Sequence, residues 1–250
     1  MSLCRDDSGN FRSVRVVVPF KLNGAKSRLA PALKPDERML LAFAMTRDVL
    51  RTVSEFGAVT VLSRPGLNPE DIEIAGKDAK TTTDAFEILE SDLDLNDALN
   101  ELIEREARRG WQKDILIVMA DLALLSKNDI AGILNCQGEV VLSPGRGGGT
   151  NMILINSPVF RTCYRGLSFP KHLAFAREAG LEATVFESFR ASSDIDQPED
   201  LVELLLHGRG EARALLEQMG FFLSDEVRAM TSPNAPIMLG HGPADSRIRM

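Results

Sequence analysis

Cysteine is scarce in this chain, and its spacing excludes a disulfide framework and a structural zinc site. The 250 residues contain three cysteines, Cys4, Cys136 and Cys163. They are odd in number and far apart, and they form neither a CxxC pair nor a zinc-ligand spacing. The sequence therefore predicts reduced thiols in a cytoplasmic protein.

The chain also lacks an excess of positive charge. It has 36 acidic against 29 basic residues, which gives a formal net charge of -7 at pH 7. Nucleic acids and anionic membrane surfaces attract proteins that carry a basic field, so we expect neither as a partner. Any anion that the protein binds must be held by basic residues gathered locally.

Long apolar runs are missing as well. No stretch approaches the roughly 20 apolar residues that span a bilayer, and the run from Ile115 to Leu125 is interrupted by Asp121. Residues 1–12 carry charges and contain no apolar run typical of a signal peptide. We therefore expect no membrane association.

The GxxxxGK[ST] and GxGxxG phosphate-binding motifs are absent, but strand-like apolar runs alternate regularly with segments of helical period. This alternation favours βαβ units and a mostly parallel sheet, and a chain of this length can bury one full core. Strands are predicted at 14–20, 58–63, 114–120, 139–143, 151–156 and 183–187, and helices at 36–54, 97–109, 126–135, 168–179 and 197–206.

Beyond residue 208 the pattern weakens. We predict one α/β domain over residues 1–208, followed by a helical extension and tail over 209–250. Helices are expected near 211–219 and 224–230, before a tail rich in proline and glycine.

The strand at 14–20 leads directly into a loop that carries Lys21, Lys26 and Arg28. Ligands of parallel α/β sheets bind beyond the carboxyl ends of the strands. Gly24 lets the backbone approach a ligand closely, and the cations suit phosphate oxygens. The loop therefore predicts a phosphate site, and a solvated basic loop is the alternative.

Three carboxylates are candidate ligands of a metal ion. Asp121 ends an apolar strand, where an unpaired charge is costly to bury. Asp194 and Asp196 are two residues apart, so in an extended segment they point the same way and could share a hard cation with Asp121. For Asp121 and Asp196, capping of a turn or helix is the alternative.

A run of glycines at residues 147–149 is costly in backbone entropy, which indicates close approach to a ligand. The neighbouring Arg146, Thr150 and Asn151 offer a charge and two hydrogen-bonding side chains for a small phosphorylated acid. Ser168 starts a helix and adds N–H groups.

These segments together resemble the 2-phospho-L-lactate guanylyltransferase family over residues 14–206. The resemblance implies a single-domain, Rossmann-like nucleotide-diphospho-sugar transferase fold with a mixed, mostly parallel sheet. It also implies GTP, magnesium and a homodimer. The matching residues are Pro19-Phe20-Lys21, Ala25-Lys26-Ser27-Arg28-Leu29, Leu95-Asn96, Ala98-Leu99, Asp121-Leu122, Gly147-Gly148-Gly149-Thr150-Asn151, Ser168-Phe169, His172, Asp194, Asp196 and Pro198.

The resemblance implies roles for individual residues. Lys26, Asp121 and Asp196 would be catalytic. The nucleotide would be bound by Pro19, Lys21, Lys26, Ser27, Arg28 and Asn96, the acid by Arg146, Thr150, Asn151, Gly166 and Ser168, and magnesium by Asp121, Asp194 and Asp196. For Asn96, capping of its helix is favoured over a nucleotide contact. For His172, packing is favoured over catalysis.

The implied reaction joins GMP from GTP to 2-phospho-L-lactate, or to a related acid such as phosphoenolpyruvate, and releases pyrophosphate in deazaflavin coenzyme biosynthesis. The phosphate of the acid would attack the α-phosphorus in line. It is already ionised near neutral pH, so no general base is required.

The chain departs from the family pattern at two positions. Ala123 stands where proline usually follows Asp-Leu, which predicts a less rigid turn. The segment from Gly166 to Ser168 is one residue shorter than the Gly-x-x-Ser form of some members.

Two other functions are alternatives to this reaction. One is a nucleotidyltransferase for molybdopterin or a sugar phosphate, and the other is a non-catalytic GTP-binding domain.

Overall fold

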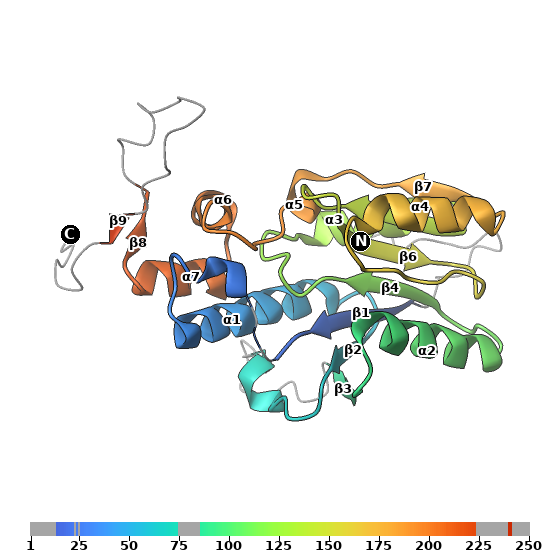
Figure 1. The fold of residues 1–250 in the computed structure, drawn as a ribbon, viewed down its shortest axis with the longest axis horizontal. Coiled ribbons are helices and arrows are strands. Elements are labelled where there is room, and N and C mark those ends of the chain that lie inside the picture. The colour runs from blue at the N-terminus through green and yellow to red at the C-terminus, as the bar shows by residue number, and fades with distance from the viewer. Residues whose placement is uncertain (1–13, 23, 25, 75–85, 224–239, 242–250) are drawn as a thin grey trace.

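The computed structural model describes residues 14–22, 24, 26–74, 86–223 and 240–241. Its centre is a seven-stranded sheet with the strand order β3-β2-β1-β4-β6-β5-β7 (Figure 1). The strands are β1 (Val14–Phe20), β2 (Ala58–Ser63), β3 (Glu87–Glu90), β4 (Asp114–Val118), β5 (Val140–Pro144), β6 (Thr150–Ile155) and β7 (Ala183–Val185). A separate pair joins β8 (Phe221–Phe222) to β9 (Gly240–His241).

The sheet is mixed and mostly parallel, as the sequence predicts. Strand β6 runs antiparallel to both β4 and β5, while the other pairs are parallel. The helices are α1 (Pro35–Val53), α2 (Leu95–Arg108), α3 (Lys127–Asn135), α4 (Ser168–Glu178), α5 (Phe189–Ser192), α6 (Asp200–His207) and α7 (Glu211–Gln218), with the short η1 (Ser27–Leu29) and η2 (Pro69–Ile72).

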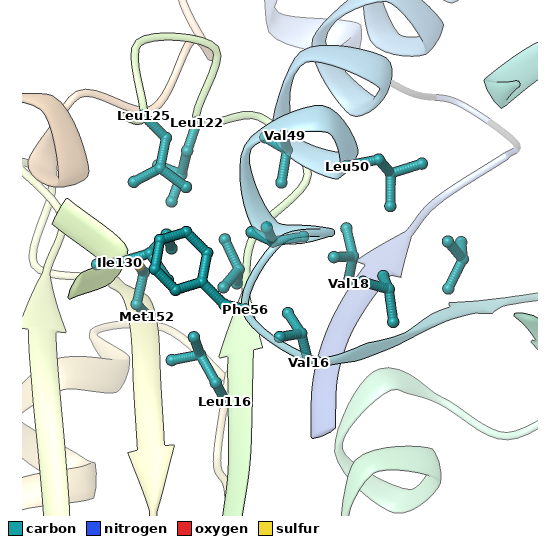
Figure 2. Close-up of a cluster of buried hydrophobic side chains, with 14 of the residues drawn as sticks. Val16, Val18, Val49, Leu50, Phe56, Leu116, Leu122, Leu125, Ile130 and Met152 are labelled. Atoms are coloured by element: carbon teal, nitrogen blue, oxygen red, sulfur yellow. The ribbon is translucent and has the colours of Figure 1, made fainter. Parts of the chain in front are cut away.

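Helices cover both faces of the sheet because apolar residues occupy both sides of its strands. Val16 and Val18 of β1 pack with α1 and α3, whereas Val17 between them packs with α2 and α4. Figure 2 shows the first of these clusters, in which Val49 and Leu50 of α1 lie over the strands. Strands buried on both faces explain the continuous β-branched run in the sequence.

A third cluster joins α6 and α7 to α1, beyond the sheet (Figure 1). Ala212 and Leu216 of α7 are fully buried in it beside Met45 of α1. The helix predicted near 211–219 is therefore present, and it packs on α1 through this cluster. The boundary at residue 208 stays a prediction, and the expected helix near 224–230 lies outside the described residues.

Several short elements, among them β3 and α5, are absent from the sequence-based prediction. Strand β3 contains four residues and has glutamates at both ends, so it shows too little alternation to be recognised. Helix α5 is a single turn capped by the hydroxyl of Ser188, which accepts a hydrogen bond from Ala191 N. Both lie beside segments that carry predicted site residues.

The order of the strands creates a switch point between β1 and β4. From β1 the chain adds β2 and β3 on one side, and then crosses to place β4 on the other side. Open α/β sheets bind ligands at the carboxyl ends of strands where the order reverses in this way. The loop with Lys21 follows β1 and Asp121 follows β4, so both lie at that position.

Candidate functional site

A cavity of about 710 Å³ opens at the carboxyl ends of β1 to β4. Its lining includes seven predicted site residues: Pro19, Lys21, Lys26, Ser27, Arg28, Asp121 and Asp196. The complete lining is residues 19–22, 24, 26–28, 42, 45–46, 62–64, 91, 93–95, 98, 119–121 and 196. Apolar walls with a few convergent charges are typical of small-molecule sites.

The ammonium group of Lys26 lies between two of the predicted carboxylates. Its Nζ donates to Asp121 Oδ2 at 2.7 Å and to Asp196 Oδ1 at 2.7 Å. Arg28 approaches the other oxygen of Asp196 at 3.3 Å, but its side chain is 71% exposed. Burial alone lowers the pKa of Lys26, but the attraction of Asp121 and Asp196 outweighs burial and raises it above its ordinary value. Lys26 is therefore charged at neutral pH.

The backbone of Lys26 is held in an unusual conformation. Its φ of 55° is left-handed, which costs a residue with a side chain about 1 kcal/mol or more. Such strain persists where surrounding contacts fix it, and here the two carboxylates hold the ammonium. The following residues turn immediately into η1, whose Leu29 is fully buried.

Asp121 retains one uncommitted oxygen. Its Oδ1 is buried and has no hydrogen-bond partner among the described residues. Its backbone carbonyl accepts a hydrogen bond from Ile195 N at 3.2 Å, which brings the 194–196 segment beside it. The turn behind it, where the sequence has Ala123, is closed by Leu125 N donating to the carbonyl of Leu122.

The donor set around Lys26 is suited to a hard cation. Magnesium is commonly held by one or two carboxylates together with phosphate oxygens of the substrate. Asp121 and Asp196 both contact the ammonium group of Lys26, and the Oδ1 atom of Asp121 has no partner among the described residues. Among the described residues, no three His, Cys, Asp or Glu side chains are grouped to hold a metal ion. These two carboxylates therefore fit magnesium if phosphates supply the remaining ligands.

The side chain of Asp194 forms its hydrogen bond with Asn151 and not with Lys26, which binds Asp121 and Asp196. Its Oδ1 accepts from Asn151 Nδ2 at 3.1 Å, and the same amide donates to the carbonyl of Ala191. Burial raises the pKa of the Asp194 carboxyl, the bond from Asn151 opposes this, and the charge of Asp121 adds to the increase. The metal role of Asp194 stays a prediction, and its established contact links the aspartate segment to β6.

Thr150 and Ser168 belong to a buried polar network around His172. Cys163 N donates to His172 Nε2 at 2.8 Å, so this nitrogen carries no proton. The neutral ring is therefore protonated on Nδ1, which donates to Thr150 Oγ1 at 2.8 Å. Ser168 Oγ lies 3.2 Å from the same oxygen. The side chains of Thr150 and Ser168 are thus bonded within the protein, and their role toward the acid stays a prediction.

The buried imidazole of His172 makes stability depend on pH. Burial lowers its pKa from 6.5 to about 4. Between these values the unfolded chain binds a proton that the folded protein excludes, so the imidazole destabilises the fold as the pH falls from 6.5 toward 4. We expect the unfolding free energy of the wild type to fall over this range by up to about 3 kcal/mol more than that of His172→Gln. Urea unfolding at a series of pH values measures the difference, and parallel curves would contradict it.

Arg146 and Gly166 lie outside the lining of the cavity. The Arg146 guanidinium is 5.0 Å from the centre of the Phe189 ring and 3.6 Å from Glu203. Gly166 has a φ of 66°, which a residue with a side chain rarely adopts. Their proposed contacts with the acid stay predictions.

The suggested capping role of Asn96 is wrong. Asp94 caps α2, because its Oδ1 accepts from Asn96 N at 2.9 Å and from Asp97 N at 3.1 Å. The side chain of Asn96 instead accepts from Tyr164 N at 2.5 Å, which fixes the segment before Gly166. An aspartate placed two residues earlier was the sequence signal for this cap.

Capping is also not the role of Asp196. Helix α6 begins at Asp200, whose Oδ2 accepts from the backbone N–H groups of Asp196 and Gln197. Both carboxylate oxygens of Asp196 face Lys26 and Arg28 instead. Because Asp200 accepts from these N–H groups, the carboxylate of Asp196 is available to the site.

Several lining residues escape sequence analysis. Ser63 is the last residue of β2 and Arg64 follows it, while Ser91 and Asp94 follow β3. Their position at the carboxyl end of a strand would have indicated Ser63 and Arg64, since β2 is a clear apolar strand. The residues after β3 were hidden because that strand was not predicted.

Comparisons with known proteins show which family the chain resembles along its sequence. A family model described as guanylyl transferase CofC like matches residues 14–233. A 2-phospho-L-lactate guanylyltransferase of Methanothrix thermoacetophila is 54% identical over 209 residues, which cover 84% of this chain and 90% of the relative. One from Archaeoglobus fulgidus is 36% identical over 214 residues, covering 85% and 94%.

Solved structures show the same fold. A putative nucleotide-diphospho-sugar transferase from Desulfovibrio desulfuricans G20 aligns with a TM-score of 0.63 and 16% identity, covering 83% of this chain and 95% of its own. A nucleotidyl transferase from Methanothermobacter thermautotroptrophicus aligns with a TM-score of 0.51 and 15% identity, covering 78% and 97%. The fold is a single nucleotide-diphospho-sugar transferase domain, and the chain belongs to the CofC-like guanylyl transferase family.

Proposed function

We propose that this enzyme joins GMP from GTP to 2-phospho-L-lactate and releases pyrophosphate. The observation that carries the proposal is the convergence of Lys26, Asp121 and Asp196 beside a nucleotide-sized cavity at the switch point of the sheet. The 54% identical relative that bears the name of this activity supports the choice of substrates.

The residues of the chain supply positioning and charge. Lys21 is exposed at the start of the loop that follows β1 and can bind a terminal phosphate. The side chain of Lys26 is more buried and lies beside Asp121. Two anionic phosphates must approach each other, so fixed cations that accompany them lower the barrier. Magnesium bound to Asp121 and Asp196 would neutralise charge on the phosphates of GTP. The attacking phosphate is ionised, so the buried neutral His172 need not act as a base.

The acid is expected on the β6 side of Asp121. Thr150 and Asn151 begin β6, which pairs directly with β4, and Phe169 N is bonded to the carbonyl of Gly148. The glycine run and the start of α4 therefore lie together, before the strand that pairs with β4. Backbone N–H groups of such a run are suited to a phosphate or carboxylate.

Pyrophosphate release measured with GTP and magnesium tests the proposal. Parallel reactions contain 2-phospho-L-lactate, phosphoenolpyruvate or a phosphoglycerate, and further reactions replace GTP by CTP or ATP. We expect release above background with GTP and 2-phospho-L-lactate, and little release when the acid is omitted. Nucleotide binding with no release for any acid would favour a non-catalytic GTP-binding domain.

Three further aspects belong to the proposal. The enzyme would act in deazaflavin coenzyme biosynthesis, in the cytoplasm and as a homodimer. Cys136 and Cys163 are free thiols, and no described helix is long and apolar enough to cross a membrane. Light scattering coupled to gel filtration tests the dimer, and a monomeric mass at assay concentration would contradict it.

A further inference from the structure

The cavity extends past the phosphate loop toward β2 and β3. The carboxyl ends of β4, β1, β2 and β3 follow one another along the edge of the sheet. Neighbouring strands lie about 4.8 Å apart, so the end of β2 is roughly 10 Å from the end of β4. A nucleotide with its phosphates near Asp121 and Lys21 would therefore place its base near the residues that follow β2.

Most polar side chains at this end already have partners. Asp94 caps α2 through Oδ1 and accepts from Arg165 through Oδ2 at 2.8 Å. Ser91 accepts a hydrogen bond from Leu93 N. Oδ1 of Asp94 thus accepts two hydrogen bonds from the start of α2, and Oδ2 accepts one from Arg165.

Ser63 and Arg64 differ from these residues. The exposed side chain of Arg64 lines the cavity and makes no hydrogen bond or ion pair to any residue that the structure describes. The hydroxyl of Ser63 is buried and also lacks a partner there, although the residue is 4% exposed and lines the cavity. A buried hydroxyl without a partner is unfavourable, so a ligand that bonds to it gains from the contact.

The remaining wall at this end is apolar. Leu62, Leu93, Leu95 and Ala98 line it. Leu93 and Leu95 are 44% and 36% exposed, so they present apolar surface against which a flat ring can pack. A purine ring has such faces, while its polar edge requires hydrogen-bonding partners.

We propose that Arg64 and Ser63 select the base of the nucleotide, with the Arg64 guanidinium donating to O6 and N7 of guanine. This inference rests on the proposed function and names residues that would determine its nucleotide specificity. An arginine fork matches the two acceptors of guanine, whereas adenine presents an amino group in place of O6. Ser63 would bond to the same end of the base. Lys21, Lys26 and Arg28 would remain with the phosphates.

Single-atom changes in the nucleotide test the contact directly. Binding of GTP, 7-deaza-GTP, ITP and ATP is measured by calorimetry without the acid, so turnover is not required. We expect 7-deaza-GTP, which lacks N7, to bind about 10-fold more weakly than GTP. ITP keeps O6 and N7 and should bind within a few-fold of GTP. Equal binding of GTP and 7-deaza-GTP, or much weaker binding of ITP, would overturn the proposal.

Variants of Arg64 test whether its side chain causes the expected differences in affinity among the nucleotides. Glutamine pairs with N6 and N7 of adenine, so Arg64→Gln should lower the GTP-to-ATP affinity ratio at least about 10-fold. It should also abolish the difference between GTP and 7-deaza-GTP. A uniform loss for all four nucleotides would instead show that Arg64 binds phosphate, and would overturn the proposal. Arg177→Gln is the matched control, because Arg177 is exposed on α4 and does not line the cavity.

Ser63→Ala separates a binding role from a structural one. Removing an unpaired buried hydroxyl should leave the melting temperature unchanged or higher, while GTP affinity falls about 3- to 10-fold. Unchanged affinity would remove Ser63 from the proposal. If GTP binds with this selectivity but no acid supports pyrophosphate release, the proposed reaction fails while the base assignment stands.

Discussion

Asp121→Asn is expected to lower kcat/KM for pyrophosphate release about 100- to 1000-fold. Asn keeps the size of the side chain but removes the charge that faces Lys26 at 2.7 Å. It also replaces one of two carboxylates that fit magnesium, and loss of such charge stabilisation is worth about 3 to 4 kcal/mol in the transition state. The apparent magnesium requirement should rise in the same variant.

A structural explanation for that loss can be separated from a catalytic one. Lys26 keeps Asp196 as a partner in Asp121→Asn, so the variant should remain folded and only moderately less stable. Circular dichroism and a thermal melt check this. Asp36→Asn, on the exposed start of α1, is the control and should retain full turnover. Turnover of a folded Asp121→Asn within a few-fold of wild type would refute the metal assignment.

Asp48→Ala is expected to destabilise the fold by about 2 to 4 kcal/mol. The Asp48 carboxylate is buried in α1 and accepts from the first two N–H groups of α7, Glu211 N at 2.8 Å and Ala212 N at 2.9 Å. It also receives a bond from Arg51 at 3.2 Å. Truncation leaves two donors unpaired near the third core cluster. Differential scanning calorimetry should show a melting temperature lower by about 5 to 15 °C.

Gly210→Ala tests the same contact between α1 and α7 by a change at the start of α7. A Cβ on Gly210 would lie 2.1 Å from Asp48 Oδ1, so the cap cannot form without movement. Its destabilisation should therefore resemble that of Asp48→Ala, and the double variant should lose much less than the sum of the two. Gly180→Ala would add strain at a helix end with no contact within 4 Å, and serves as a control for backbone strain alone. Additive effects of Asp48→Ala and Gly210→Ala would show that the cap is not what joins α7 to α1.

The pKa of Asp48 explains why this cap requires several donors. Burial raises the pKa of its carboxyl, and the hydrogen bonds from Ala212 and Glu211 and the charge of Arg51 oppose that change. The net direction is upward, so the buried charge is not fully compensated. Nothing in the local sequence around Asp48 indicates this role, because its partners lie more than 160 residues away.

Much of the fold follows from local patterns. The β-branched run of β1, the apolar run before Asp121 and the helical periods of α1 and α3 depend on neighbouring residues, and the predicted elements appear with shifts of a few residues. Strand β3 and the start of α2 were not predicted correctly because one short strand and one capping aspartate carry little local signal.

The sequence by itself determined that Lys26 and Asp121 end up at one edge of a mostly parallel sheet, because each follows a recognisable strand and strand ends share an edge. Asp196 follows α5 instead, so the order of the strands does not place it. The tertiary structure alone decided how they meet: Lys26 lies between the two aspartates, while Asp194 turns to Asn151. It also buried Thr150 and Ser168 around His172 and brought Arg64 into the cavity. Pairings between residues far apart depend on strand order and side-chain direction, which no local pattern encodes.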